Sequence, residues 1–196
     1  MSAYFFTALP GLVLGTLLAL AVWHDVKARR IPNNIVFAGA LAGLALNALL
    51  PAGNGLFSES FGSIGFLKSL AGWTVGLALL LPIYAMRAMG AGDVKLMAMI
   101  GAFVGPQAVV AVALLSMVAG GVLALLVAVF KGQVVQVVTN VYQIAMHSVF
   151  RALAGAGVRV DSPAAPTGKL AYAIAIAAGT GLQIYLSRTQ GLRLFS

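Results

Sequence analysis

The chain contains no cysteine and very few charged residues. Without cysteine, disulfides, thiol nucleophiles and cysteine-based zinc sites are excluded. Only 8% of the 196 residues are charged and 61% are hydrophobic, whereas roughly 25% of residues are charged in a typical soluble domain. A soluble fold of this length has too little interior for so many apolar side chains, because its surface fraction is set by its size. We therefore expect a membrane protein whose solvent is the lipid bilayer.

The net charge of +8 is spread along the chain. The basic residues stand singly or in short groups at the ends of apolar runs, which is how Lys and Arg orient a membrane protein. A nucleic-acid partner is therefore not expected. The two histidines, His24 and His147, are far apart in sequence, so we predict no histidine metal site.

Six apolar runs reach, or nearly reach, the ~20 residues that cross a ~30 Å hydrocarbon core. No Lys or Arg precedes Lys27, so we interpret the first run as a retained helix rather than a secretion signal. The sequence predicts an all-α polytopic bundle of six transmembrane helices that forms one domain over residues 1–196. The runs are Ala3–Trp23, Ile35–Leu50, Ile64–Met86, Ala88–Val104, Gln107–Phe130 and Leu170–Leu186.

Residues 131–169, between the fifth and sixth runs, are mixed in character. Gln, Thr, Asn and His recur among apolar residues over 134–150, a pattern typical of an amphipathic helix on the membrane surface. A water-exposed strand stays open as an alternative. Residues 154–168 contain Gly, Pro, Ser and Asp and predict a loop.

The basic residues predict the orientation of the bundle, because cytoplasmic segments are enriched in Lys and Arg. Nine fall on one side and three on the other, which places both termini outside the cytoplasm. The nine are Lys27, Arg29, Arg30, Arg87, Lys95, Lys131, Arg151, Arg159 and Lys169, against Lys68, Arg188 and Arg193.

Four acidic residues are present in the whole chain. Glu59 and Asp161 fall in segments rich in Gly, Ser or Pro, where a solvated acid is ordinary. Asp25 directly follows the first run and Asp93 opens the fourth, and the predicted topology brings both to the cytoplasmic face. Two neighbouring carboxylates can share a proton. One then activates water as a base while the other acts as an acid, which is the chemistry of an aspartic peptidase.

The residues alone are also compatible with purely structural roles for both acids. Asp93 could simply cap its helix, and Asp25 could pair with Lys27 or Arg29 at the headgroup level. Intramembrane acids also form proton relays in small transporters, usually deeper in the membrane than these two. A non-catalytic assembly protein with the same fold is a further alternative.

Two segments resemble those of the type IV prepilin peptidase family. Asp25-Val-Lys-Ala-Arg-Arg-Ile-Pro-Asn resembles the first catalytic segment, and Gly90-Ala-Gly-Asp-Val-Lys-Leu resembles the GxGD segment that the family shares with other intramembrane aspartyl proteases. The later Lys169-Leu-Ala-Tyr-Ala-Ile-Ala-Ile is similar to the final helix of the family. The short six-helix form is similar to the CpaA/TadV-like branch, which serves tight-adherence (Flp) pili.

The resemblance implies a bacterial inner-membrane peptidase with Asp25 and Asp93 as its catalytic pair. It further implies cleavage of the basic leader of a prepilin precursor at the cytoplasmic face, without a cofactor. Larger members carry cysteine pairs for zinc in an extra domain, so precursor N-methylation is not expected here. Family members commonly have proline where this chain has Ala171, a departure that concerns helix packing more than chemistry.

Five residues are predicted to support the pair or to lie near the substrate. We expect Pro32 to begin the second helix and propose that Asn33 orients Asp25. The small residues Gly90 and Gly92 permit close approach of another backbone. Lys95 is too near Asp93 in sequence for a pairing within the helix and could bind a lipid phosphate.

Glycines four residues apart predict close helix packing. Asn47 predicts a hydrogen bond between helices. The glycine pairs are Gly39/Gly43, Gly72/Gly76 and Gly101/Gly105.

Overall fold

The structure, a computed structural model, describes residues 2–51, 53, 56, 63–87, 89–153 and 171–189. Seven helices occupy this part of the chain, and the predicted all-α class is confirmed. Each of the six apolar runs coincides with one helix to within a few residues. The helices are α1 (Ser2–Ala28), α2 (Asn33–Leu49), α3 (Phe66–Ala85), α4 (Ala91–Val104), α5 (Pro106–Phe130), α6 (Val134–Leu153) and α7 (Tyr172–Thr189).

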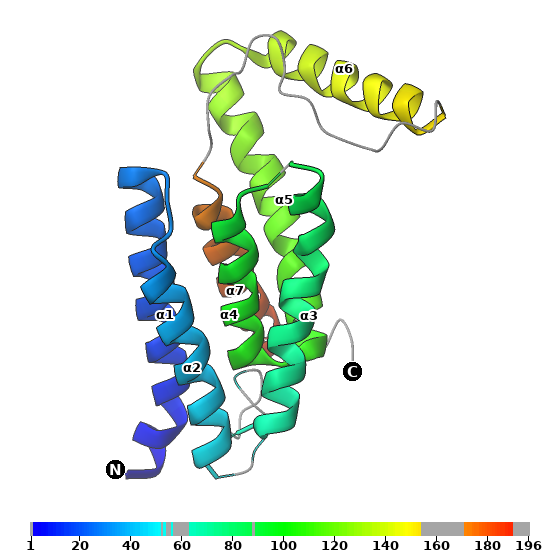
Figure 1. The fold of residues 1–196 in the computed structure, drawn as a ribbon. Coiled ribbons are helices and arrows are strands. Elements are labelled where there is room, and N and C mark those ends of the chain that lie inside the picture. The colour runs from blue at the N-terminus through cyan, green and yellow to red at the C-terminus, as the bar shows by residue number, and fades with distance from the viewer. Residues whose placement is uncertain are drawn as a thin grey trace.

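Six of these helices form a bundle and α6 lies across one end of it (Figure 1). The predicted amphipathic segment is therefore helical, and the strand alternative is wrong. The predicted loop over residues 154–168 lies outside the described residues. Six membrane-crossing helices were predicted. Among the described helices, three are long and apolar enough to cross a membrane, and two further apolar helices are shorter. The three are Leu9–Ala28, Phe66–Ala85 and Pro106–Phe130; the shorter two are Asn33–Leu49 and Tyr172–Ser187.

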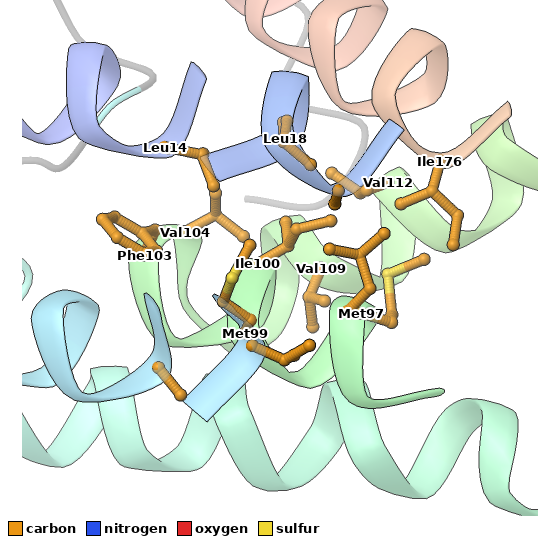
Figure 2. Close-up of a cluster of buried hydrophobic side chains, with 14 of the residues drawn as sticks. Leu14, Leu18, Met97, Met99, Ile100, Phe103, Val104, Val109, Val112 and Ile176 are labelled. Carbon is orange, nitrogen blue, oxygen red and sulfur yellow. The ribbon is translucent and has the colours of Figure 1, made fainter. Parts of the chain in front are cut away.

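Helix α4 is the centre of the bundle. It has 14 residues and is therefore about 21 Å long at 1.5 Å per residue, short of a ~30 Å hydrocarbon core. It packs against α1, α2, α3, α5 and α7, and every residue from Leu96 to Val104 is buried. A helix enclosed by protein on all sides does not have to match the thickness of the bilayer. Figure 2 shows its side chains meeting those of α1, α5 and α7.

Glycines set the distance between α3 and α4. A Cβ on Gly72 would lie 2.1 Å from the backbone oxygen of Gly101, and a Cβ on Gly76 would lie 2.6 Å from that of Met97. Both neighbours are backbone atoms that cannot move aside independently. The predicted role of these glycines in helix packing is confirmed, since only a residue without a side chain fits at such a contact.

The end of α4 far from Asp93 is closed by hydrogen bonds and a tight turn. The buried Asn47 of α2 donates to the backbone oxygen of Ala102 at 2.9 Å and accepts from the backbone N–H of Ile64 at 3.1 Å. Its predicted interhelical hydrogen bond is confirmed. Gly105, at φ 85°, then turns the chain into α5. Pro106 begins α5, where its missing N–H costs no helical hydrogen bond.

Candidate active site

Asp25 lies in the last turn of α1. The sequence placed it just after a helix ending at Trp23, but α1 continues to Ala28, so that boundary is corrected. Polar residues are compatible with a helix, and loss of hydropathy marks the edge of the apolar core rather than the helix end. The helix ends where Arg29 adopts a left-handed φ of 52°, with its N–H donating to the Asp25 backbone oxygen at 2.8 Å.

The carboxylate of Asp25 is directed into the bundle toward α7. Its side chain is only 8% exposed, and its Oδ2 accepts the backbone N–H of Ala173 at 3.1 Å. Ala173 is the second residue of α7, in the turn whose N–H groups have no partner within the helix. The first and last helices of the bundle thus meet at this carboxylate.

Asp93 lies in the first turn of α4 as its third residue. The N-cap position is occupied by Gly90, without a side-chain cap hydrogen bond, so Asp93 does not open the helix as the sequence suggested. Its backbone N–H donates to the Gly90 oxygen at 3.2 Å. A Cβ on Gly90 would come within 3.3 Å of the Asp93 Oδ2. The glycine therefore leaves room for the carboxylate beside the entry to α4.

Three contacts join the segment that follows Asp25 to the Asp93 segment. The buried Ile31 packs on Gly92, where a Cβ would lie 3.3 Å from the Ile31 Cβ. The Lys95 Nζ donates to the Asn33 Oδ1 at 3.0 Å and lies 5.6 Å from the centre of the Phe37 ring. The turn between α1 and α2 is thereby fixed on the first turns of α4.

These contacts bring the two carboxylates together. Asp25 and Asp93 lie close enough for their charges to interact, and Tyr172 at the start of α7 is within reach of the Asp93 charge. Three segments that are distant in sequence therefore converge at one end of the bundle. Two carboxyl groups whose charges interact are easier to ionise one at a time than together, and such a pair can act on a water molecule as acid and base.

The other predicted site residues occupy definite positions. Pro32 is the N-cap of α2 rather than its first residue, because the helix begins at Asn33. Asn33 was proposed to orient Asp25, but the partner of its side-chain oxygen is Lys95. Gly92 admits the side chain of Ile31, where the approach of a backbone was expected.

The flanking residues of Asp25 face elsewhere. The His24 Nδ1 donates to the Leu20 backbone oxygen at 2.9 Å, and Lys27 lies over the Trp23 ring at 5.9 Å from its centre. Within the described residues, no group of three His, Cys, Asp or Glu side chains could hold a metal ion.

Sequence reasoning missed the parts that Ile31, Tyr172 and Ala173 play in building the site. The Tyr172 ring lies against Gly120 of α5, where a Cβ would be 2.6 Å from its Cε2. Its hydroxyl donates a long hydrogen bond to the Ser116 backbone oxygen at 3.4 Å. The only available signal was the similarity of the Lys169–Ile176 segment to a family's final helix, which gave no contacts.

Both segments that carry the carboxylates match a known family. The model of the type IV leader peptidase family matches residues 12–125, more than half of the chain. The chain belongs to the type IV leader peptidase family. Both Asp25 and Asp93 lie within the matched residues, whereas α7 lies beyond them.

One curated relative supports this membership. It is the "Prepilin leader peptidase/N-methyltransferase" of Myxococcus xanthus (strain DK1622), which is 32% identical over 130 residues. The alignment covers 63% of this chain and 36% of the relative, so the chain spans about a third of that protein's length. No solved structure matches the chain.

Proposed function

We propose that this member of the family is an aspartic endopeptidase that removes the basic leader from a type IV, Flp-like prepilin. The observation that supports the proposal is that Asp25 and Asp93 lie at the same end of the bundle, close enough for their charges to interact. Family membership supports the substrate class, since the relative is named a prepilin leader peptidase. The proposal places the protein in the bacterial inner membrane, with both termini outside and the carboxylates facing the cytoplasm.

The reaction needs one ionised and one protonated carboxyl group. The ionised group takes a proton from a water molecule as the water oxygen attacks the scissile carbonyl. The protonated group donates to the carbonyl oxygen, and a proton later passes to the leaving amine. Two adjacent carboxyl groups can hold opposite protonation states because both cannot easily be ionised at short range. This chemistry uses the two aspartates and no bound cofactor.

The proposal is tested by Asp25→Asn and Asp93→Asn in a precursor-cleavage assay with purified, reconstituted protein. Each variant keeps its shape but cannot ionise, so cleavage should fall by about a thousandfold or more. Lys27→Gln is the matched control at the same helix end, and it should retain cleavage. Near-normal cleavage by either Asn variant, with melting temperature unchanged, would contradict the proposal and favour a non-catalytic role.

We further propose that this chain cleaves without methylating its product. The proposal rests on the family resemblance: larger members carry cysteine pairs for zinc in an extra domain, whereas this sequence contains no cysteine. Mass spectrometry of the processed N-terminus after incubation with a methyl donor tests this point. An added methyl group would contradict it while leaving the peptidase proposal intact.

A further inference from the structure

We propose that the first turn of α7 positions Asp25 for cleavage through the backbone N–H of Ala173. The inference rests on the proposed peptidase function and extends it to a helix that carries neither catalytic aspartate. Ala173 acts through Asp25 and is therefore a positioning residue. Its side chain is a methyl group, so the group that acts is the backbone amide.

The contact is buried and links distant parts of the chain. Ala173 is 0% exposed and Asp25 is 8% exposed, and their hydrogen bond measures 3.1 Å. Water therefore has little access with which to replace this donor. A carboxylate that accepts an N–H makes a stronger hydrogen bond than a neutral acceptor does. Loss of the donor leaves a buried carboxylate oxygen without its partner, which is costly.

The hydrogen bond also fixes the orientation of the Asp25 carboxylate. Oδ2 accepts the N–H from α7, and this fixes the plane of the carboxylate, whose remaining acceptor sites can serve a water molecule or the Asp93 carboxyl. Reacting groups must be held within a few tenths of an ångström for efficient catalysis. The Asp25 side chain lies in the last turn of its helix, just before the helix ends at Arg29. A second helix, α7, therefore helps to hold its position.

Helix α7 is itself fixed against α5. A Cβ on Gly179 would lie 2.5 Å from the backbone nitrogen of Ser116, so the two backbones touch there. The ring of Tyr172 fills the space beside Gly120 one turn further along α5. These contacts set the height of α7 and thus the position of the Ala173 N–H. The donor is part of a rigid element rather than of a loop.

Two proline variants separate the hydrogen bond from the helix. Proline is tolerated in the first turn of a helix. Ala173→Pro removes the N–H that Asp25 accepts. Ile174→Pro places the same ring one residue later, where it removes the Ile174 N–H that donates to the Ala171 oxygen at 3.2 Å but leaves the Ala173 N–H in place. We expect kcat of Ala173→Pro to fall about 10- to 100-fold, as for one hydrogen bond to a charged group. The KM should stay unchanged, and Ile174→Pro should lose far less.

An ester substitution tests the same point without added bulk. Lactic acid in place of Ala173 exchanges the N–H for an oxygen and keeps the methyl side chain, and the matched control carries lactic acid at Ala177. The expected result is a kcat loss confined to position 173, with equal melting temperatures. Equal kcat values for the two esters would overturn the inference. If Asp25→Asn cleaves normally, the peptidase proposal itself fails, so the two failures are distinguishable.

A different observation supports a second inference: α6 lies in the membrane surface with its valine-rich face in lipid. That face consists of Val134, Val135, Val138, Val141, Tyr142 and Met146, all exposed. The opposite face carries Gln136, Asn140 and Gln143. Residues at these spacings form two continuous stripes on a helix. In the described part of the chain, α6 has its main contacts with α5 alone.

Lipid is the occupant that fits this face. Helix α6 lies across the bundle axis (Figure 1), and that axis follows the membrane normal because α5 is a candidate span. The helix before it, α5, also exposes large apolar side chains, including Leu126 and Val129, near the end that leads into α6. An amphipathic helix in this orientation buries its apolar side at the boundary between headgroups and acyl chains.

The absence of cysteine makes the test direct, because single cysteines can be spin-labelled without background. Val138→Cys and Val141→Cys report the valine-rich face, and Gln136→Cys and Gln143→Cys report the polar face. In vesicles, the first pair should show an oxygen-to-nickel accessibility ratio several-fold above that of the second pair. Equal ratios on both faces would overturn the inference, as would a valine-rich face shielded from both reagents, the result expected for a protein partner.

Discussion

The two ends of α4 use small residues in opposite ways. Toward its C-terminus, Gly101 meets Gly72 backbone to backbone, and Asn47 of α2 seals the last turn. Toward its N-terminus, Gly90 and Gly92 adjoin side chains, those of Asp93 and Ile31. The first end is a rigid foundation, and the second leaves room for ionisable groups. Small residues at tight contacts therefore serve helix packing at the C-terminal end of α4 and the candidate site at its N-terminal end.

The largest effect on stability should come from disrupting the close contact between α3 and α4. Gly72→Ala places a Cβ 2.1 Å from the Gly101 oxygen, which forces α3 and α4 apart. We expect a loss of about 3 kcal/mol in the free energy of unfolding, with cleavage lost as the bundle loosens. Thermal unfolding in detergent measures the change. Gly15→Ala is the control, because nothing lies within 4 Å of its Cβ position, and an equal loss there would show that the backbone contact is not the cause.

A smaller effect should follow from removing the Asn47 hydrogen bonds at the same end of α4. Asn47→Ala removes the donor to Ala102 and the acceptor for the Ile64 N–H. Hydrogen bonds between membrane helices contribute about 0.6 kcal/mol on average and up to about 1.7 kcal/mol. We expect a loss of about 1 kcal/mol, measured by the same unfolding assay, with near-normal cleavage per folded molecule. Cleavage that falls far more than stability would mean that this end takes part in the reaction.

The smallest stability effect should occur at the end with the carboxylates. Gly92→Ala brings a Cβ to 3.3 Å from the Ile31 Cβ, a contact that a small shift relieves, while alanine gains up to about 1 kcal/mol in helix propensity. The free energy of unfolding should change by less than about 1 kcal/mol. Cleavage should fall more than stability does, because the shift separates the Asp25 segment from Asp93. A stability loss as large as that of Gly72→Ala would erase the distinction between the two ends.

Much of this arrangement could be predicted from the sequence. Hydropathy located all six bundle helices, because lipid demands long apolar runs. Glycine spacing predicted close helix packing, since close backbones exclude side chains, but not that α3 and α4 would be the partners. The two aspartates stood out because acids are rare in such a chain, and the topology placed them at one end.

The remaining features depend on contacts that leave no pattern in the sequence. The donor to Asp25 is a backbone N–H, which every residue but proline possesses, so nothing marked Ala173. Asn33 was predicted to orient Asp25 because the two are close in sequence. Its side chain, on α2, instead accepts a hydrogen bond from Lys95 of α4. Helix α1 passes the end of its apolar run because its end is set by backbone geometry at Arg29 rather than by hydropathy.

Whether the two distant aspartates form one site is tested most directly by thiol cross-linking. In this cysteine-free chain, Asp25→Cys combined with Asp93→Cys gives the only two thiols. A short bifunctional bimane, fluorescent once both of its ends have reacted, should label this double variant. It should not label the pair Asp25→Cys and Lys68→Cys, because Lys68 lies at the start of α3, at the other end of the bundle. Fluorescence from the Asp25–Asp93 pair alone is the predicted result; its absence, with each single cysteine reactive, would contradict a shared site.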